Sequence, residues 1–156
     1  MFILWRRYGI IHKKDRLSIK TDGKVKRIIM EKRLFQSHCV FPTPDIQKTA
    51  GYYERVLGFH AAQYLDAKEP HICLYRDDTE IILTVANAPK VLPNRELYGY
   101  GYDAYFITDR QDALQQEFID AGALVVRPLS DTDYHNHEFV VEDIDGRWIG
   151  FGLKGI

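Results

Sequence analysis

The 156-residue chain has few cysteines and no long apolar run, and each of these absences excludes a class of protein. Only Cys39 and Cys73 are present, and they form no CxxC pair, so the chain is not a disulfide scaffold. No apolar run approaches the roughly 18 residues that cross a bilayer, and Phe2-Ile3-Leu4-Trp5 is too short for the core of a signal peptide. We therefore expect a soluble, cytoplasmic protein without a membrane partner.

Charge is unevenly distributed along the chain. Residues 1–33 carry eleven Lys and Arg against three Asp and Glu, a balance of +8, whereas residues 34–156 carry ten against nineteen, a balance of −9. The overall composition, 46% hydrophobic and 28% charged, is that of a globular protein. At about 100–200 residues per domain, the length predicts one domain or two small modules sharing a core. We therefore expect a basic extension over 1–33 joined to an acidic domain over 34–156.

The extension contains a hairpin signal. Strand-like residues 17–21 and 24–28 flank Asp22-Gly23, a pair favoured in two-residue type I′ turns. One interpretation is an arm that binds nucleic acid or a membrane surface. The favoured one is a poorly ordered terminus, because the segment lacks the interleaved aromatic residues typical of nucleic-acid binding. Nucleic acid is therefore not an expected partner.

The domain contains an internal repeat. The first copy predicts a strand over 35–41, a turn over 42–45 and a helix over 46–57, and the second predicts a strand over 102–108 and a helix over 110–121. Asp45 and Gly58 are thirteen residues apart, and so are Asp109 and Gly122. Each Asp stands where a helix N-cap belongs, and each Gly stands where a left-handed residue ends a helix.

Three further strands follow each helix. They are predicted over 60–65, 71–75 and 80–85 in the first copy, and over 124–129, 138–141 and 148–153 in the second. A linker over 86–101 is marked by Pro89, Pro93, Gly99 and Gly101. The sequence therefore predicts an α+β fold of two tandem βαβββ modules, at about 34–85 and 102–153, whose curved mixed sheets form a cleft with the helices outside.

Successive side chains of a strand point to opposite faces of its sheet, so the order of residues along the predicted strands assigns each residue to one of two faces. The predicted core face is apolar and comprises Cys39, Phe41, Ile81, Leu83, Ala104, Phe106, Ile149 and Phe151. The opposite face mixes carboxylates, aromatic rings, a histidine and small residues, as small-molecule sites do. Its candidate ligand-binding residues are His38, Glu80, Ile82, Asp103, Tyr105, Trp148 and Gly150.

Two segments carry a family resemblance. Pro44-Asp45-Ile46, Tyr52-Tyr53 and Leu57-Gly58-Phe59 in the first copy, with Phe139–Gly146 and Ile149-Gly150-Phe151-Gly152 in the second, resemble the glyoxalase/bleomycin resistance/dioxygenase (vicinal oxygen chelate) superfamily. The resemblance implies the paired-module fold and a homodimer whose clefts are completed by the partner or by strand exchange. Because the superfamily includes isomerases, dioxygenases, lyases and drug-binding proteins, it does not fix a reaction.

The resemblance also implies where a metal would bind. The family's four ligand positions fall on His38, Ile82, Asp103 and Gly150, and two of these have no ligating side chain. A catalytic metal generally needs three protein ligands, so we expect no metal and no other cofactor. The alternative is a triad of His38, Glu80 and Asp103. A second cluster, His135 and His137, has the spacing of two ligands but is interpreted as a polar turn.

These observations favour a metal-independent, small-molecule-binding protein of the bleomycin-resistance type. The alternative is a metal-dependent lyase, isomerase or dioxygenase of the same superfamily. Carboxylates such as Asp103 and Glu80, beside the rings of Tyr105 and Trp148, favour a planar or positively charged ligand. Gly150 is expected to leave space for that ligand.

Overall fold

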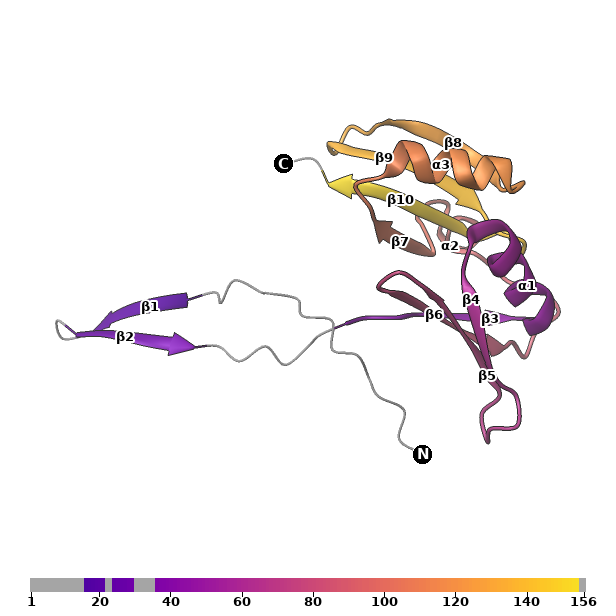
Figure 1. Cartoon of the computed structure of the whole chain (residues 1–156), viewed down its shortest axis with the longest axis horizontal. Coiled ribbons are helices and arrows are strands. Elements are labelled where there is room, and N and C mark those ends of the chain that lie inside the picture. The colour runs from indigo at the N-terminus through magenta and orange to yellow at the C-terminus, as the bar shows by residue number, and fades with distance from the viewer. Residues whose placement is uncertain (1–15, 22–23, 30–35, 155–156) are drawn as a thin grey trace. The chain divides into compact units, whose positions relative to one another are not determined.

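The computed structural model describes residues 16–21, 24–29 and 36–154, and Figure 1 shows its helices and strands. Contacts divide the chain into two units, residues 1–37 and residues 38–156. In the first unit, β1 (Arg16–Thr21) and β2 (Lys24–Ile29) pair antiparallel with Thr21 opposite Lys24. This register confirms the two predicted strands, while the Asp22-Gly23 turn lies outside the described residues.

The second unit contains two four-stranded mixed sheets, each covered by one helix. The first module comprises β3 (Cys39–Thr43), α1 (Ile46–Leu57), β4 (His60–Tyr64), β5 (His71–Arg76) and β6 (Thr79–Val85), in the sheet order β3-β6-β5-β4. The second comprises β7 (Ala104–Ile107), α3 (Gln111–Asp120), β8 (Leu124–Asp131), β9 (Asn136–Glu142) and β10 (Trp148–Lys154), in the order β7-β10-β9-β8. Figure 1 shows α3 lying along one face of the second sheet. The predicted α+β fold of two βαβββ modules is confirmed.

Two elements differ from the prediction. Strand β3 continues through Pro42 to Thr43, where a turn was expected, because β3 is an edge strand and tolerates a residue without an N–H. The linker contains a short helix, α2 (Asn94–Tyr98), between Pro93 and Gly99. Gly99 has a φ of 81°. Proline is a usual signal for the start of a helix, and a glycine with positive φ is a usual signal for its end.

The two long helices begin differently. In α1, Asp45 is the N-cap, and its carboxylate accepts a hydrogen bond from the backbone N–H of Lys48 at 2.9 Å, as predicted. In α3, the N-cap is Arg110, not Asp109, and no side chain caps the helix. The loop is held instead by Thr108, whose hydroxyl accepts from the N–H of Arg110. The two copies of the repeat therefore place their helices at corresponding positions, but only α1 has a side-chain N-cap.

Substitution of the two aspartates tests this difference. We expect Asp45→Ala to lower the free energy of unfolding by about 1 kcal/mol, because it removes the only side-chain acceptor at the start of α1. Asp109→Ala should change it by less than about 0.5 kcal/mol. Urea denaturation measures both. Equal losses in the two variants would contradict the assignment of Arg110 as the N-cap.

The core lies between the helices and the sheets and combines both modules. The predicted core face is confirmed: six of its residues are under 9% exposed, and Cys39 and Phe106 pack against them. Burial raises the pKa of the Cys39 thiol, as expected for a packing residue. Ala121, the last residue of the second predicted helix, lies exposed at the C-cap of α3. No described helix is long and apolar enough to span a membrane.

A buried ionic network joins the loop before β10 to the first module. Arg147, whose side chain is 3% exposed, forms ion pairs with Asp143 at 3.1 Å and Asp145 at 2.9 Å. These ion pairs use Nη1 of Arg147, and its Nη2 donates to the backbone carbonyl of Pro42. The hydroxyl of Tyr53, in α1, donates to Asp143 at 2.9 Å. This network fixes the second module against the first.

Candidate functional site

In the first sheet, two of the predicted site residues lie together. His38 Nδ1 is 2.8 Å from Glu80 Oε2, and both side chains are partly exposed. Ile82, two residues after Glu80 in β6, is half-buried and lies opposite Cys73 of β5. The imidazole and carboxylate therefore pair with each other at one end of the first sheet.

Asp103 has a structural partner for each of its oxygens. Oδ1 accepts from the backbone N–H of Asn94, and Oδ2 accepts from the backbone N–H of Trp148, both at 3.0 Å. The carboxylate thereby joins α2 to the start of β10. Each oxygen thus accepts one backbone hydrogen bond that fixes the orientation of the carboxylate, and its predicted role toward a cationic ligand stays a prediction.

The donor groups do not fit a metal ion. His38 and Glu80 lie in the first module, whereas Asp103 lies in the second and is held by backbone amides. Within the described part of the chain, no group of three or more His, Cys, Asp or Glu residues is placed to hold an ion. The alternative triad of His38, Glu80 and Asp103 is therefore not formed, and no step of a reaction is assigned to a metal.

Gly150 does not leave the space that the sequence predicted. A Cβ atom at this position would lie 2.6 Å from Cδ2 of Tyr105, because the tyrosine ring lies across β10 at this point. Gly152 accommodates the same ring two residues later, where an added Cβ would lie 2.5 Å from Cβ of Glu138. The glycines therefore make room for Tyr105 and not for a ligand.

A buried carboxylate surrounded by tyrosines is the main polar feature of the second sheet. Glu138, in β9, is 3% exposed. Its Oε1 accepts hydrogen bonds from the hydroxyls of Tyr102 and Tyr134, each at 2.5 Å. Its Oε2 accepts from the hydroxyl of Tyr105 at 2.7 Å and from the amide of Asn136 at 3.2 Å. We call these five residues the tyrosine cage.

The cage keeps Glu138 ionised. Burial alone would raise the pKa of Glu138, but the hydrogen bonds from Tyr102, Tyr134, Tyr105 and Asn136 outweigh it and lower that pKa below its usual value. Burial and the carboxylate raise the pKa of Tyr102 and of Tyr105. The tyrosines therefore remain protonated donors around a carboxylate.

Trp148 lies beside this cage and already contacts two cations. The guanidinium carbons of Arg127 and Arg95 lie 4.7 Å and 5.2 Å from the centre of its ring. Its indole N–H donates to Glu142 Oε2 at 2.9 Å, and Arg95 donates to the same oxygen. Arg127 also donates weakly, at 3.4 Å, to the hydroxyl of Tyr102. Trp148 is thus held in one orientation on the side of the sheet that faces away from α3.

A cavity of about 220 Å³ adjoins the cage. The polar and apolar residues that line it come from β8, β9 and the turn between them: Arg127, Ser130, Thr132, Asp133, Tyr134, Glu138 and Val140. Its volume is roughly that of seven water molecules, which suits one ring system or a substituent of a larger molecule. None of the predicted site residues lines this cavity.

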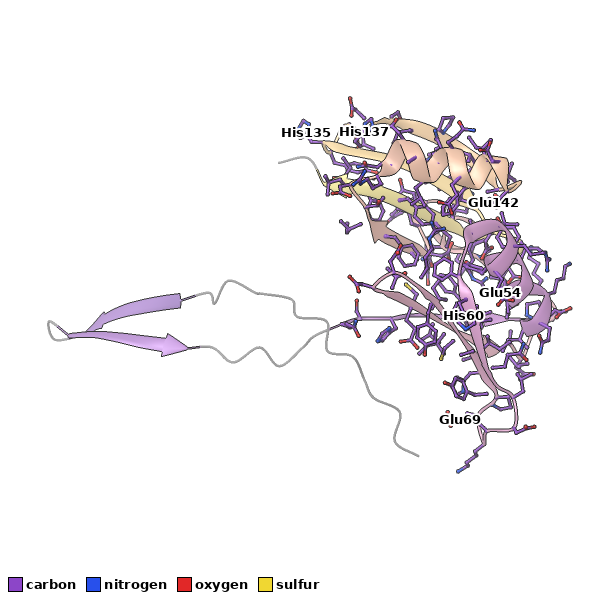
Figure 2. All side chains as sticks on the ribbon, in the orientation of Figure 1. Glu54, His60, Glu69, His135, His137 and Glu142 are labelled. Atoms are coloured by element: carbon purple, nitrogen blue, oxygen red, sulfur yellow. The ribbon has the colours of Figure 1, made fainter. Side chains whose placement is uncertain are left out.

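The two histidines of the second cluster do not form a metal site. His135 has a φ of 65° and lies in the turn before β9, so it does not share a strand face with His137. His137 Nδ1 is 2.7 Å from Asp131 Oδ1. Figure 2 shows both histidines at one end of the second sheet, with Glu142 at the other end. The interpretation of a polar turn fits this geometry.

Sequence reasoning placed Tyr105 at the candidate site but missed the other residues of the cage and the cavity, although a signal was present. Glu138 stands at a strand position whose neighbours Phe139 and Val141 are buried on the other face, so its side chain had to point toward the predicted site. Its three tyrosines lie up to 36 residues away in the chain. Their convergence depends on the pairing of β7, β9 and β10, which the alternation pattern does not specify.

Comparison with solved structures shows where this fold occurs. The antibiotic-binding protein TnmS3 from Streptomyces sp. CB03234 is 19% identical with a TM-score of 0.61, over 80% of this chain and 100% of that one. A glyoxalase/bleomycin resistance protein/dioxygenase superfamily member from Sphaerobacter thermophilus is 16% identical with a TM-score of 0.61, over 78% and 98%. TioX from Micromonospora sp. ML1 is 20% identical with a TM-score of 0.56, over 76% and 98%.

Sequence comparison identifies the family. No curated protein sequence matches the chain significantly. The model of the Glyoxalase/Bleomycin resistance protein/Dioxygenase superfamily matches residues 36–151, which include both modules and the linker. With the two βαβββ modules described above, this match shows that the chain belongs to the glyoxalase/bleomycin resistance protein/dioxygenase superfamily.

Proposed function

We propose that the protein binds a small organic molecule, without a metal ion, on the face of the second sheet that carries Trp148 and the tyrosine cage. The observation that carries this proposal is the cavity of about 220 Å³, which is lined by Tyr134 and Glu138 of the cage and by Arg127, whose guanidinium packs on the ring of Trp148. An aromatic ring next to a small cavity with a few polar groups is the usual composition of a ligand site. The fold similarity to the antibiotic-binding protein TnmS3 supports a ligand of the antibiotic type.

The donor set supports independence from metal. Of the four positions that resemble the family's ligands, Ile82 and Gly150 offer no ligating atom, Asp103 is held by two backbone amides, and His38 is paired with Glu80. A lyase, isomerase or dioxygenase of this superfamily that depends on a metal would need at least three such ligands. Binding without metal chemistry is therefore the function that these residues support best.

Elemental analysis tests the metal-free proposal. We expect the purified protein to contain far less than a stoichiometric amount of Zn, Ni, Mn or Fe after mild dialysis, because the described residues supply no three-ligand set. The control is the same protein dialysed with excess Zn²⁺, then against buffer. A stoichiometric amount of metal retained in either sample would favour the metal-dependent enzyme instead.

Removal of the indole ring tests the location of the site. Tryptophol, a neutral indole alcohol, serves as a planar probe without charge. We expect Trp148→Ala to weaken its binding by about 1–2 kcal/mol, because stacking on an aromatic face contributes that much. The control is Tyr98→Ala, which removes another exposed ring, 69% exposed, on α2. Calorimetric titration giving equal affinities for the wild type and Trp148→Ala would place the ligand elsewhere.

We propose further that the protein is a homodimer. The edge strands β3 and β7 expose Val40 and Ile107, which are 57% and 66% exposed, so each sheet ends in an apolar edge. Burial of these side chains against a second copy would remove them from water. Light scattering is expected to give twice the chain mass, and Val40→Asp with Ile107→Asp should give the monomer. A monomeric wild type at micromolar concentration would contradict this part of the proposal.

A further inference from the structure

The tyrosine cage fixes the direction of the hydrogen bonds around the cavity. The hydroxyl of Tyr134 donates its proton to Glu138, so only its oxygen lone pairs remain for a ligand. The hydroxyl of Thr132 donates to the carbonyl of Asn136 and accepts from the N–H of the same residue. Of the three hydroxyls at the cavity, those of Tyr134 and Thr132 are therefore unable to donate without breaking a bond, whereas that of Ser130 is able to donate.

The charges around the cavity lead to the same result. Two carboxylates line it, Glu138 and Asp133, against one cation, Arg127. Glu138 is 3% exposed and forms no ion pair with any cation among residues 36–153, since its four hydrogen bonds come from neutral groups. The guanidinium of Arg127 rests against the rings of Trp148 and Tyr102. The buried carboxylate thus has no direct ion pair, and Arg127 is linked to it through the hydroxyl of Tyr102.

We infer that this cavity selects a protonated organic amine, and that Glu138 and Asp133 are its specificity-determining residues. An ammonium group has three donors and no acceptor, which complements the carboxylate of Asp133 and the phenol oxygen of Tyr134. Glu138, whose oxygens already accept four hydrogen bonds, acts on the ligand through its charge. A carboxylate or phosphate ligand would meet two negative charges against one cation, Arg127. The inference rests on the proposed function of this face and names the class of ligand that it binds.

A series of three indoles with different charge tests the inference. Tryptamine carries an ammonium, tryptophol a hydroxyl and indole-3-acetate a carboxylate on the same ring system. We expect tryptamine to bind the wild type about tenfold more tightly than tryptophol and more tightly still than indole-3-acetate, because a charge-assisted hydrogen bond is roughly twice as strong as a neutral one. Calorimetry measures the affinities, and amide NMR shifts of β8 and β9 locate the site.

Two variants and one control assign the selectivity to residues. Glu138→Gln keeps the side-chain shape and should reduce the preference for tryptamine over tryptophol to about twofold or less. Asp133→Asn, at an exposed position, should reduce it several-fold while leaving the fold intact even if Glu138→Gln does not fold. The control is Glu117→Gln, which removes the same charge from α3, where Glu117 pairs with Arg76. It should leave the preference unchanged.

The outcomes separate the two proposals. Equal binding of all three probes at β8 and β9 would overturn the inference while leaving the proposed small-molecule function in place. Tightest binding of indole-3-acetate would also overturn it and would assign the selectivity to Arg127. An unchanged preference for tryptamine in both Glu138→Gln and Asp133→Asn would overturn the assignment of selectivity to these two carboxylates. Shifts from none of the probes would contradict the proposed function and the inference with it.

Discussion

Arg147→Ala is expected to lower the free energy of unfolding by about 3–5 kcal/mol, the usual cost of leaving one partner of a buried ion pair alone. Arg147 is 2% exposed and Asp143 is 5% exposed, so water cannot replace the lost guanidinium. The variant also removes the donor to the carbonyl of Pro42 in β3. Since each kcal/mol corresponds to a few degrees for a chain of this length, the melting temperature should fall by roughly 10 °C or more.

Thermal and urea denaturation measure this loss against a matched arginine. The control is Arg110→Ala, because the side chain of Arg110 is 84% exposed and its Nε is 3.8 Å from Oδ1 of Asp109. Its loss should change the free energy of unfolding by less than about 0.5 kcal/mol. If Arg147→Ala lowered the free energy of unfolding by less than about 1 kcal/mol, the ionic network of Arg147, Asp143 and Asp145 would not hold the two modules together.

Gly152→Ala is the second substitution with a large expected effect. Its Cβ would overlap the hydroxyl oxygen of Tyr105 and would lie 2.5 Å from Cβ of Glu138 and 2.8 Å from the backbone carbonyl of His137. The backbone of β9 cannot withdraw without losing its ladder with β10. We therefore expect a loss of about 2–3 kcal/mol, as for overpacking of a filled site.

The same substitution in a helix provides the control. Gly51→Ala adds a Cβ within α1, where the nearest atom is the flexible end of Arg55. Alanine is about 1 kcal/mol better than glycine inside a helix, so this variant should be neutral or more stable. If Gly152→Ala were as stable as the wild type, Tyr105 could not lie across β10 as described.

The fold could be predicted because its signals are local. Alternation along each strand separates buried positions such as Ile81 and Leu83 from their neighbours, and the spacing of Asp45 and Gly58 defines α1. The second helix shows the limit of that reasoning. Asp109 stands at the corresponding position, yet the helix starts one residue later, because the choice of N-cap depends on the backbone conformation of the preceding loop.

The candidate site was predicted only in part because it depends on contacts between distant strands. Trp148 lies on the predicted face, beside the cavity residue Arg127, but Asp103 is committed to backbone amides and Gly150 is covered by Tyr105. Sequence alternation assigns a side chain to a face, whereas its partners depend on register between strands. Of the two carboxylates Glu138 and Asp103, Glu138 lines the cavity and Asp103 does not.

The central claim is that the second-sheet face binds an organic ligand without a metal. It is tested most directly by heteronuclear NMR of chelator-treated protein titrated with tryptamine. We predict saturable shifts of backbone amides in β8, in β9 and at Trp148, with none in the first sheet around His38 and Glu80. Shifts confined to the first sheet, or shifts that appear only after Zn²⁺, Mn²⁺ or Fe²⁺ is added, would contradict the account.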